Sequence, residues 1–423
     1  LATAALNLVP HRGLDFGMSL VLHLAATAGW LWLVRGVVAG GYRPGFGEAL
    51  GLAVLLRLLV LPLSPALSDD VYRYVYEGEL VLAGGNPYTT PPVEAPEELR
   101  GEYWQLINNP EIPAAYPPAV QYGLALGVLI SPSPFGMKVL FGALDLLVFV
   151  VLWRWLPLLG VGREGAVVYG FCPLMVLEFA GEGHNDSLAV LFMVLALWLF
   201  GSRRFGLAGG SLAVATAGKF LPGMLLPFLV RDSWRVLGVF VVVLGLLYVG
   251  FLAPVGEMFE GAENYARRWR GNESLFALII EPLEWLEREG RLGGKEAQEL
   301  AKYPLAAMGL GLLAFAWRRR WPLEKVAAAF FMFYMALTPV LHPWYLAFLV
   351  PFLCVYVNWG WLAFTGSVFL AYHVLPGWLE EGTWEERVWV KVVEYVPLYA
   401  GFFLIGYKQR GRSSPIRPQA DAS

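Results

Sequence analysis

Charged side chains are scarce in this sequence. Asp, Glu, Lys and Arg make up 15% of the 423 residues, whereas a soluble protein usually carries about 25%. An ordinary water-facing surface cannot be built from so few charges, so the length does not indicate two or three soluble domains of ~150 residues. A polytopic membrane protein fits the composition, with 57% hydrophobic residues and a mean hydropathy of +0.55.

Several kinds of site are missing as well. The two cysteines, Cys172 and Cys354, lie in separate apolar runs, which excludes a disulfide framework or a cysteine zinc site and favours small buried residues. The net charge of −3 excludes a strongly basic nucleic-acid binder. The sequence has no nucleotide-binding fingerprint after a strand, no Walker loop and no H-E-x-x-H. We therefore expect neither nucleic acid among its partners nor a soluble nucleotide-binding domain.

Apolar runs that suit a membrane crossing, which takes about 20 residues, recur along the chain. We expect crossings at 17–38, 48–66, 137–156, 165–180, 187–201, 235–253, 303–317, 326–341, 344–357, 360–375 and 388–406. The fold class is therefore all-α, with roughly 11 to 14 transmembrane or re-entrant helices. One integral-membrane domain is expected to cover residues 1–423.

Two apolar runs do not fit a simple crossing. The run 206–230 contains Gly218, Lys219 and Pro222, so it is expected to form two short helices that meet at Lys219. The run 119–131 is short and is expected to be re-entrant or interfacial.

Basic residues between the runs predict the orientation, because short cytoplasmic loops carry an excess of Lys and Arg. They gather in the segments 201–205, 231–235 and 318–325 and in the tail from Lys408. The two long hydrophilic loops, 67–117 and 254–302, then lie on the external side of a plasma-membrane protein. Leu1 also falls outside, which is consistent with a preceding helix that this sequence does not include.

The first external loop opens with a candidate catalytic acid. The motif S-D-D-V-Y-R-Y holds Asp69 and Asp70 where the second apolar run leaves the bilayer. Arg73 and Tyr74 follow Asp70 at i+3 and i+4, so they share its helix face. A carboxylate at an apolar boundary is suited to act as a general base. The plainer alternative is that both acids mark the water boundary.

A second polar cluster, G-E-G-H-N-D, lies between two apolar runs. It contains Glu182, His184, Asn185 and Asp186. Polar residues packed between membrane helices are costly unless they face a cavity. Capping of the next helix by Asn185 or Asp186 is an alternative, but it does not explain Glu182 and His184. Metal binding by His184 and Asp186 is a third interpretation.

Three further groups are candidates for the same site. Lys219 is alone in an apolar stretch, where it either snorkels to the interface or binds an anion in the external cavity. His342 and Tyr345, in L-T-P-V-L-H-P-W-Y, belong either to an aromatic belt or to the site. Arg267 and Arg268 in the second loop are either solvated or recognise phosphate through forked hydrogen bonds.

Four of these blocks, in this order, resemble the GT-C superfamily of polytopic glycosyltransferases. They are S-D-D-V-Y-R-Y with G-N-P-Y, then G-E-G-H-N-D, the lysine in A-G-K-F-L-P, and T-P-V-L-H-P-W-Y, over residues 68–345. Within the superfamily the sequence looks most like the bacterial polyprenyl-phosphate-mannose-dependent α-mannosyltransferases.

The resemblance implies an inverting transfer of a hexose, with mannose indicated by resemblance alone. The donor would be a sugar on polyprenyl phosphate, and the acceptor a hydroxyl on the external face. The family's acid falls on Asp70, which would take the acceptor proton, and Asp69 is the weaker candidate. The donor phosphate would be stabilised by Lys219, Arg267, Arg268 and His342. Residues expected to bind or position substrate are Arg73, Tyr74, Glu182, His184, Asn185, Asp186, His342 and Tyr345.

The expected partners are the lipid-linked donor, a glycan or lipid acceptor and membrane lipids. No cofactor is required in this mechanism, although Mg²⁺ or Mn²⁺ bound by the acid pair is an open alternative; the oligomeric state is left open. The alternative function is a secondary transporter or flippase of lipid-linked sugars, which also uses intramembrane charges and broken helices. Against it, the two halves show no convincing repeat and the charged candidates map to one side of the membrane.

Overall fold

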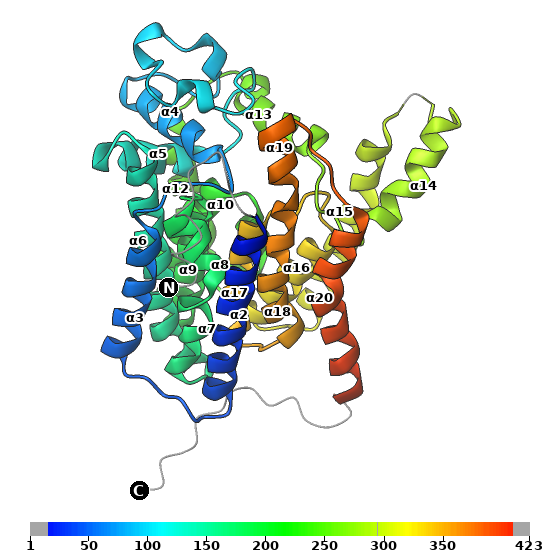
Figure 1. Cartoon of the computed structure of the whole chain (residues 1–423). Helices are drawn as coiled ribbons and strands as arrows, with labels where there is room; N and C mark the ends of the chain where they lie inside the picture. The colour runs from blue at the N-terminus through cyan, green and yellow to red at the C-terminus, as the bar shows by residue number, and fades with distance from the viewer. Residues whose placement is uncertain (1–15, 294, 409–423) are drawn as a thin grey trace, which may run out of the picture.

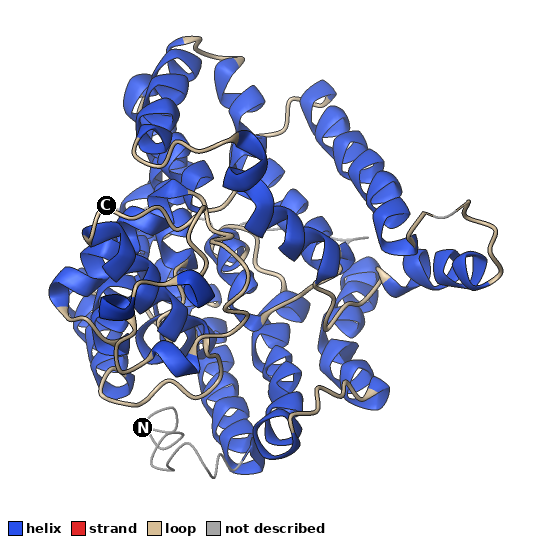
Figure 2. Cartoon of the chain, turned by 90° about the horizontal axis from the view of Figure 1, so that it is seen from above, coloured by secondary structure: helices blue, strands red, loops and turns tan. Residues whose placement is uncertain are grey.

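The computed structural model describes residues 16–293 and 295–408, and these fold into helices and loops (Figure 1). Within these residues no strand forms, and the one β-type contact is an isolated bridge between Gly271 and Val340 (Figure 2). The side chains of Arg268 and of residues 402–408 are outside the description, as are Leu1 and the basic residues of the tail beyond Lys408.

The α-helices are α2 (Phe16–Val38), α3 (Phe46–Val60), α4 (Asp70–Leu82), α5 (Pro118–Ile130), α6 (Pro134–Trp155), α7 (Val167–Gly170), α8 (Pro173–Val176), α9 (Asp186–Gly201), α10 (Phe205–Gly218), α11 (Leu226–Val230), α12 (Arg235–Val249), α13 (Val255–Arg268), α14 (Ala277–Arg288), α15 (Ala297–Arg318), α16 (Leu323–Leu337), α17 (Val350–Leu353), α18 (Trp359–Ser367), α19 (Leu375–Glu381) and α20 (Val388–Lys408). The short helical turns are η1 (Pro92–Glu94), η2 (Glu97–Leu99), η3 (Trp104–Leu106), η4 (Leu156–Leu159), η5 (Arg163–Ala166), η6 (Leu177–Gly181), η7 (Leu221–Leu225), η8 (Pro343–Phe348) and η9 (Val368–Val374).

Four helical units in the described ranges are long and apolar enough to cross a membrane. They are α2, Pro134–Leu159, α15 and Trp359–Glu381. A fifth is the pair Arg163–Gly170 and Pro173–Gly181, which is bent by 58°. Shorter apolar helices are α5, α9, α10, α12 and the unit Leu221–Val230. The prediction of an all-α polytopic membrane protein is confirmed.

Helices form at nearly all of the predicted apolar runs. The run 206–230 divides as expected, since α10 ends at Gly218 and η7 begins at Leu221, with Lys219 at the break. The predicted crossing at 344–357 is wrong, because this stretch forms the separate short elements η8 and α17. Pro343 is the first residue of η8 and Pro351 the second residue of α17, and proline cannot continue a preceding helix because it lacks an N–H.

The connections bring the polar motifs to one end of the bundle. α9 and α10 pack against each other and are joined by a short turn, so they are antiparallel. The start of α9 at Asp186 therefore lies beside the end of α10 at Lys219, and the basic turn 201–205 lies at the opposite end. η8, which follows His342, packs against α9 and completes this group.

α4 lies across this end of the bundle, and the loop that follows it, residues 83–117, lies above it (Figure 1). α4 packs on the bundle through an apolar cluster that contains Val71 and Tyr74 of α4 and Phe141 of α6. Gly78 permits the close approach to α5, because an added Cβ would lie 2.6 Å from the carbonyl oxygen of Leu124. The N-terminal turn of α4 is thus held rigidly over the polar motifs.

Candidate active site

The site is built around the first turn of α4, where two adjacent acids share one amide. Asp70 is the first residue of α4, and Asp69 precedes it as the N-cap. The side-chain amide nitrogen of Asn108 donates to Asp69 Oδ1 at 2.6 Å and to Asp70 Oδ1 at 2.8 Å. Both acids are half-buried. Burial, followed by the neighbouring Asp70 carboxylate, raises the pKa of Asp69.

Glu182 fixes the backbone that leads into this turn. Its carboxylate accepts hydrogen bonds from the N–H groups of Ala66 at 3.0 Å and Leu67 at 2.9 Å. Lys138 donates to the carbonyl oxygen of Leu63 just before them. Because both carboxylate oxygens of Glu182 bind backbone, this residue positions α4 rather than facing the open part of the site.

The G-E-G-H-N-D motif turns its polar side chains inward. The chain leaves η6 at Gly181, and Gly183 has a φ of +81°, which glycine adopts without strain. Asn185 stands at the N-cap of α9, but its side chain forms no capping hydrogen bond. The plain capping role considered for Asn185 is therefore excluded.

Several polar atoms of this motif are buried without a hydrogen-bond partner in the described residues. They are Nε2 of His184, both side-chain atoms of Asn185, and Oδ2 of Asp186. Leaving a buried donor or acceptor unsatisfied costs about 1–3 kcal/mol. A polar ligand with hydroxyl groups can satisfy such atoms, so their arrangement favours a binding site over simple packing.

His184 links the second motif to the last one. Its Nδ1 lies 3.0 Å from Glu178 Oε2, and Glu178 Oε1 accepts a hydrogen bond of 2.8 Å from Tyr372. The imidazole stacks on Trp344 at 3.8 Å, and Trp344 stacks on His342 at 4.4 Å. The G-E-G-H-N-D motif and the His342 motif are therefore joined by one aromatic stack.

Lys219 points into the bundle and pairs with a buried acid. Its Nζ lies 2.9 Å from Asp186 Oδ1 and above the rings of Tyr345, at 4.5 Å, and Tyr116, at 5.3 Å. Tyr345 in turn contacts the hydroxyl of Tyr265 on α13 at 2.5 Å. A buried carboxylate such as Asp186 needs a paired charge. Its ammonium partner is thus held inside the bundle and does not snorkel to the interface.

Two tyrosines lie between the acid pair and the lysine. The hydroxyl of Tyr74 is 3.5 Å from Asp70 Oδ2 and 3.1 Å from the hydroxyl of Tyr116. Tyr116 carries Lys219 against its ring, and its carbonyl oxygen accepts a 2.7 Å hydrogen bond from Tyr88 in the N-P-Y motif. The Asp70 carboxylate and the Lys219 ammonium are therefore linked through these two tyrosines into one polar cluster.

The arginines predicted for the site are placed differently from one another. Arg73 is buried and contacts Glu77 at 2.7 Å and the carbonyl oxygen of Ile112 at 2.6 Å, so it orders the loop that carries Asn108. Arg267 pairs with Glu263 at 2.9 Å, and both side chains are more than half exposed. Neither arginine joins the buried cluster, and the Arg268 side chain lies outside the described residues.

The part of the chain that the structure describes contains no group of three or more His, Cys, Asp or Glu side chains placed to hold a metal ion. The divalent cation at the acid pair stays a prediction. Cys172 and Cys354 are buried and free, as predicted.

Four contributors to the site were not predicted: Asn108, Tyr116, Tyr265 and Tyr372. Tyr116 lies in the A-Y-P-P turn, whose two prolines indicated a shaped loop. Asn108 stands in an irregular loop and Tyr265 on an amphipathic helix, and neither has a sequence signal that separates it from its neighbours. Asn108 and Tyr265 lie at the site only because the two long loops fold back over this end of the bundle.

The fold and the site together define a polytopic membrane protein in which a carboxylate pair and a lysine belong to one polar cluster. The chain belongs to the alpha-(1→6)-mannopyranosyltransferase family, because a model of that family's N-terminal domain matches residues 8–235, just over half of the chain. The match covers the acid pair, the G-E-G-H-N-D motif and Lys219, whereas the His342 motif lies beyond it. The resemblance seen in the sequence is thereby confirmed.

Two curated relatives share this similarity. Alpha-(1→6)-mannopyranosyltransferase A of Mycobacterium tuberculosis is 29% identical over 212 residues, which are 48% of this chain and 39% of the relative. Alpha-(1→6)-mannopyranosyltransferase A of Corynebacterium glutamicum is 26% identical over 245 residues, which are 52% of this chain and 47% of the relative. The matched region spans less than half the length of each relative.

Proposed function

We propose that the protein is an inverting membrane glycosyltransferase. It moves a hexose, which we propose is mannose, from a polyprenyl-phosphate donor to a hydroxyl of a glycan or lipid acceptor on the external face of the plasma membrane. The observation that carries the proposal is the series of contacts that runs from the half-buried Asp70 carboxylate through Tyr74 and Tyr116 to the Lys219 ammonium. The relatives' names, which specify alpha-(1→6)-mannopyranosyl transfer, support mannose as the sugar.

Asp70 is placed to act as the general base. Its Oδ1 is occupied by Asn108, whereas Oδ2 has only the 3.5 Å contact with Tyr74 and is free to accept a proton. As Asp70 removes the acceptor proton, the acceptor oxygen forms a bond to the anomeric carbon. The bond from that carbon to the phosphate oxygen breaks, and its electron pair leaves with the lipid phosphate. Attack from the side opposite the phosphate inverts the anomeric centre, through a transition state with oxocarbenium character.

Lys219 is placed to stabilise the departing phosphate. An ammonium group has three N–H donors, and Asp186 holds one direction, which leaves the others for phosphate oxygens. Apolar and aromatic side chains lie nearby, since Phe220, Tyr248 and Phe259 line a small gap together with Tyr116, whose ring Lys219 contacts. A cation beside apolar side chains suits a phosphate attached to an isoprenoid chain. Preorganised positive charge at the developing anion is the usual source of such catalysis.

The orientation of the helices supports an external site. The basic turn 201–205 joins α9 and α10 at the end opposite Asp186 and Lys219. A second basic turn, 319–322, joins α15 and α16 at the far end of the helix that leads to His342. Since basic turns face the cytoplasm, the polar cluster with Asp186 and Lys219 faces the external side of the membrane. On that side, lipid-linked sugars replace nucleotide sugars as donors.

The experiment that tests the proposal is a transfer assay in nanodiscs. It combines purified protein, radiolabelled polyprenyl-phosphate mannose and short α-(1→6)-linked mannose oligosaccharides, with and without EDTA. We expect label in a longer oligosaccharide, and a loss of about 10²–10⁴-fold in Asp70→Asn, the usual contribution of a general base. Glu97→Gln is the control, because Glu97 is an exposed acid in the same loop.

Three results would contradict parts of this proposal. Near-wild-type turnover in Asp70→Asn would remove Asp70 as the base. Transfer only from glucosyl or arabinosyl donors would replace mannose as the sugar. Movement of labelled lipid across a sealed bilayer, without a new glycosidic bond, would favour the transporter or flippase.

A further inference from the structure

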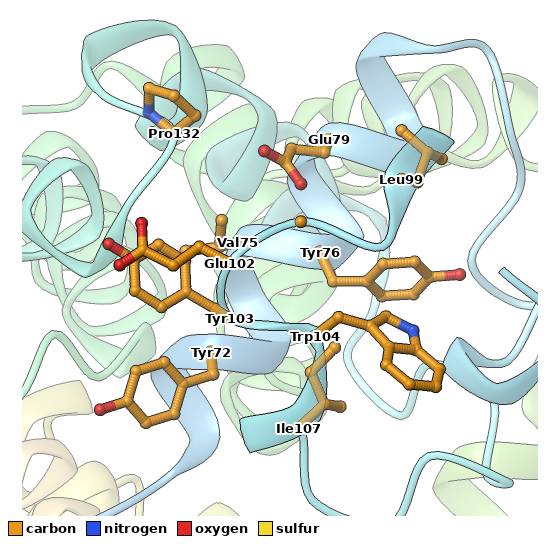
Figure 3. A pocket seen from close by; sticks show the side chains of 11 residues that line it. Tyr72, Val75, Tyr76, Glu79, Leu99, Glu102, Tyr103, Trp104, Ile107 and Pro132 are labelled. Atoms are coloured by element: carbon orange, nitrogen blue, oxygen red, sulfur yellow. The ribbon is translucent and has the colours of Figure 1, made fainter. Parts of the chain in front are cut away.

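A hollow lies along another face of α4, beneath the loop 99–107 (Figure 3). The space between its lining atoms, part of it open to solvent, is about 350 Å³, so it is an open hollow and not an enclosed cavity. The mechanism proposed above does not use it. Its walls belong to α4 and the loop 99–107, with Pro132 from the turn between α5 and α6.

This hollow leads to the catalytic acids. Asp69, Tyr72, Tyr76 and Glu79 follow one another at i, i+3, i+7 and i+10, so they form a single face of the helix. Asp70 lies on the neighbouring face with Tyr74. A molecule lying along the hollow thus reaches the acid pair at the N-terminal end of α4.

The loop wall of the hollow leads to the same point. Ile107 lines the hollow, and the next residue, Asn108, donates to both Asp69 and Asp70. On the loop side, only Asn108 stands between Ile107, which lines the hollow, and the proposed base Asp70. On the helix side, only Val71 stands between Tyr72, which also lines the hollow, and Asp70.

The lining offers flat aromatic faces together with hydrogen-bonding groups. Figure 3 shows Tyr72 beside Tyr103 on one side and Tyr76 near Trp104 on the other. The rings of Tyr72 and Tyr103 are 5.8 Å apart with an interplanar angle of 22°. Glu79 closes one end and is half-buried, and burial raises its pKa.

These groups match an uncharged pyranose. The C–H face of a sugar ring packs on aromatic rings, which carry a large apolar surface, and sugar hydroxyls donate to carboxylates and exchange hydrogen bonds with phenols. No lysine or arginine lines the hollow among the described residues. Arg100 lies next to it, with its guanidinium 4.9 Å from the Trp104 ring, but it donates to the backbone carbonyl oxygens of Ala95 and Val93. The lining itself therefore suits a neutral molecule better than a phosphate.

We propose that this hollow is an acceptor subsite, which holds one neutral pyranose unit of a glycan so that the hydroxyl of its neighbouring unit reaches Asp70. The proposal rests on the proposed transferase function. It also separates the two substrates, with the acceptor on the α4 face and the lipid donor on the Lys219 side.

The test uses two variants of the hollow, Tyr103→Ala and Glu79→Gln, with Tyr103→Phe as the conservative variant. Tyr103 is half-buried, so its truncation leaves the core intact. The control is Gln105→Ala, since Gln105 is an exposed residue of the same loop that does not line the hollow. Each purified protein is assayed for transfer to α-(1→6)-linked mannotriose. Binding of mannotriose without donor is measured by saturation-transfer difference NMR.

We expect the acceptor KM to rise about tenfold in Tyr103→Ala, equivalent to about 1.4 kcal/mol, and to rise in Glu79→Gln. The donor KM and the kcat at saturating acceptor should stay unchanged, and Tyr103→Phe should retain most of the acceptor affinity because it keeps the ring. The NMR signal should weaken in Tyr103→Ala and persist in Gln105→Ala.

The outcomes separate this inference from the proposed function. An acceptor KM and an NMR signal that are unchanged in both Tyr103→Ala and Glu79→Gln would overturn the subsite while leaving the transferase intact. A wild-type protein that transfers no sugar would overturn the proposed function. In that case, an NMR signal lost in Tyr103→Ala still supports a pyranose site, and a wild-type protein without signal at millimolar mannotriose overturns it.

Discussion

Replacing Asn108 by alanine is expected to impair the acid pair while leaving the fold intact. The Asn108 amide is the group that holds both carboxylates, with contacts of 2.6 Å to Asp69 and 2.8 Å to Asp70. Asn108 is half-buried and lies in a loop, so its truncation opens no cavity in the apolar core. The change therefore tests the orientation of the base separately from its chemistry.

The size of the effect follows from the two hydrogen bonds. A hydrogen bond to a charged group contributes about 1.5–3 kcal/mol, and water can replace part of each bond at a half-buried position. A net loss of about 1.4–2.8 kcal/mol in the transition state corresponds to about a 10- to 100-fold lower kcat. Removing a donor also disfavours the ionised form of a carboxylate, so the acid limb of the pH–rate profile should move to higher pH.

The assay measures transfer to α-(1→6)-linked mannotriose as a function of pH, together with thermal unfolding in detergent. Asn108→Asp is the companion variant. It adds a third carboxylate beside Asp69 and Asp70, and we expect a larger loss that is partly recovered at low pH. Gln105→Ala is the control. Wild-type kcat and an unshifted acid limb in Asn108→Ala, with normal unfolding, would refute the assignment of Asn108 as the positioning residue of the base.

Three further predictions address the rest of the site. Lys219→Met should abolish donor use and lower thermal stability, because it leaves Asp186 buried and unpaired. The double variant with Asp186→Asn should recover thermal stability but not sugar transfer. Arg288→Met, at an exposed position, is the control. Glu182→Ala should lower the free energy of unfolding by about 1–3 kcal/mol, because it leaves the N–H groups of Ala66 and Leu67 without this acceptor; thermal unfolding near about pH 5 measures this loss without a change of buried charge, since burial raises the pKa of Glu182 to about 7. Burial raises the pKa of Asp69, so the folded state keeps this proton at a higher pH than the unfolded chain. The contribution of Asp69 to the stability of the wild type therefore falls as pH rises above about 4. Asp69→Asn should unfold at a higher temperature than the wild type near neutral pH, and the difference should vanish near about pH 4.

Most helices were predictable because the signal for them is local. An apolar run of about 20 residues, bounded by basic or polar residues, identifies a membrane helix whatever it packs against. The break at Lys219 was predictable for the same reason, since Gly218, Lys219 and Pro222 lie within five residues. The error at 344–357 shows the limit of this approach. The stretch is apolar enough to cross, but Pro351 lies within it and Pro343 just before it, and hydropathy does not register a missing N–H.

The candidate site was predictable only as a set of residue types. Short motifs identified five polar residues whose burial among apolar helices is costly and therefore indicates a function, namely Asp69, Asp70, His184, Asp186 and Lys219. They did not indicate which of them contact one another. The bridge from Asn108 spans 39 residues to Asp69, and the contact between Tyr372 and Glu178 spans 194. No local pattern encodes such pairs, because they depend on where the loops run.

The sequence by itself determined that the protein is a helical membrane protein, that a helix breaks at Lys219, and which polar residues are candidates for the site. These follow from the cost of placing polar groups in a bilayer, which each segment meets on its own. The tertiary structure alone decided the role of each residue. It made Glu182 and Arg73 supports for α4 and its loop, paired Lys219 with Asp186, left Arg267 on the surface, and placed an aromatic hollow beside the acids. The physical reason is that hydrogen bonds, ion pairs and stacking act over a few ångströms, so the packing of segments distant in sequence determines which groups meet.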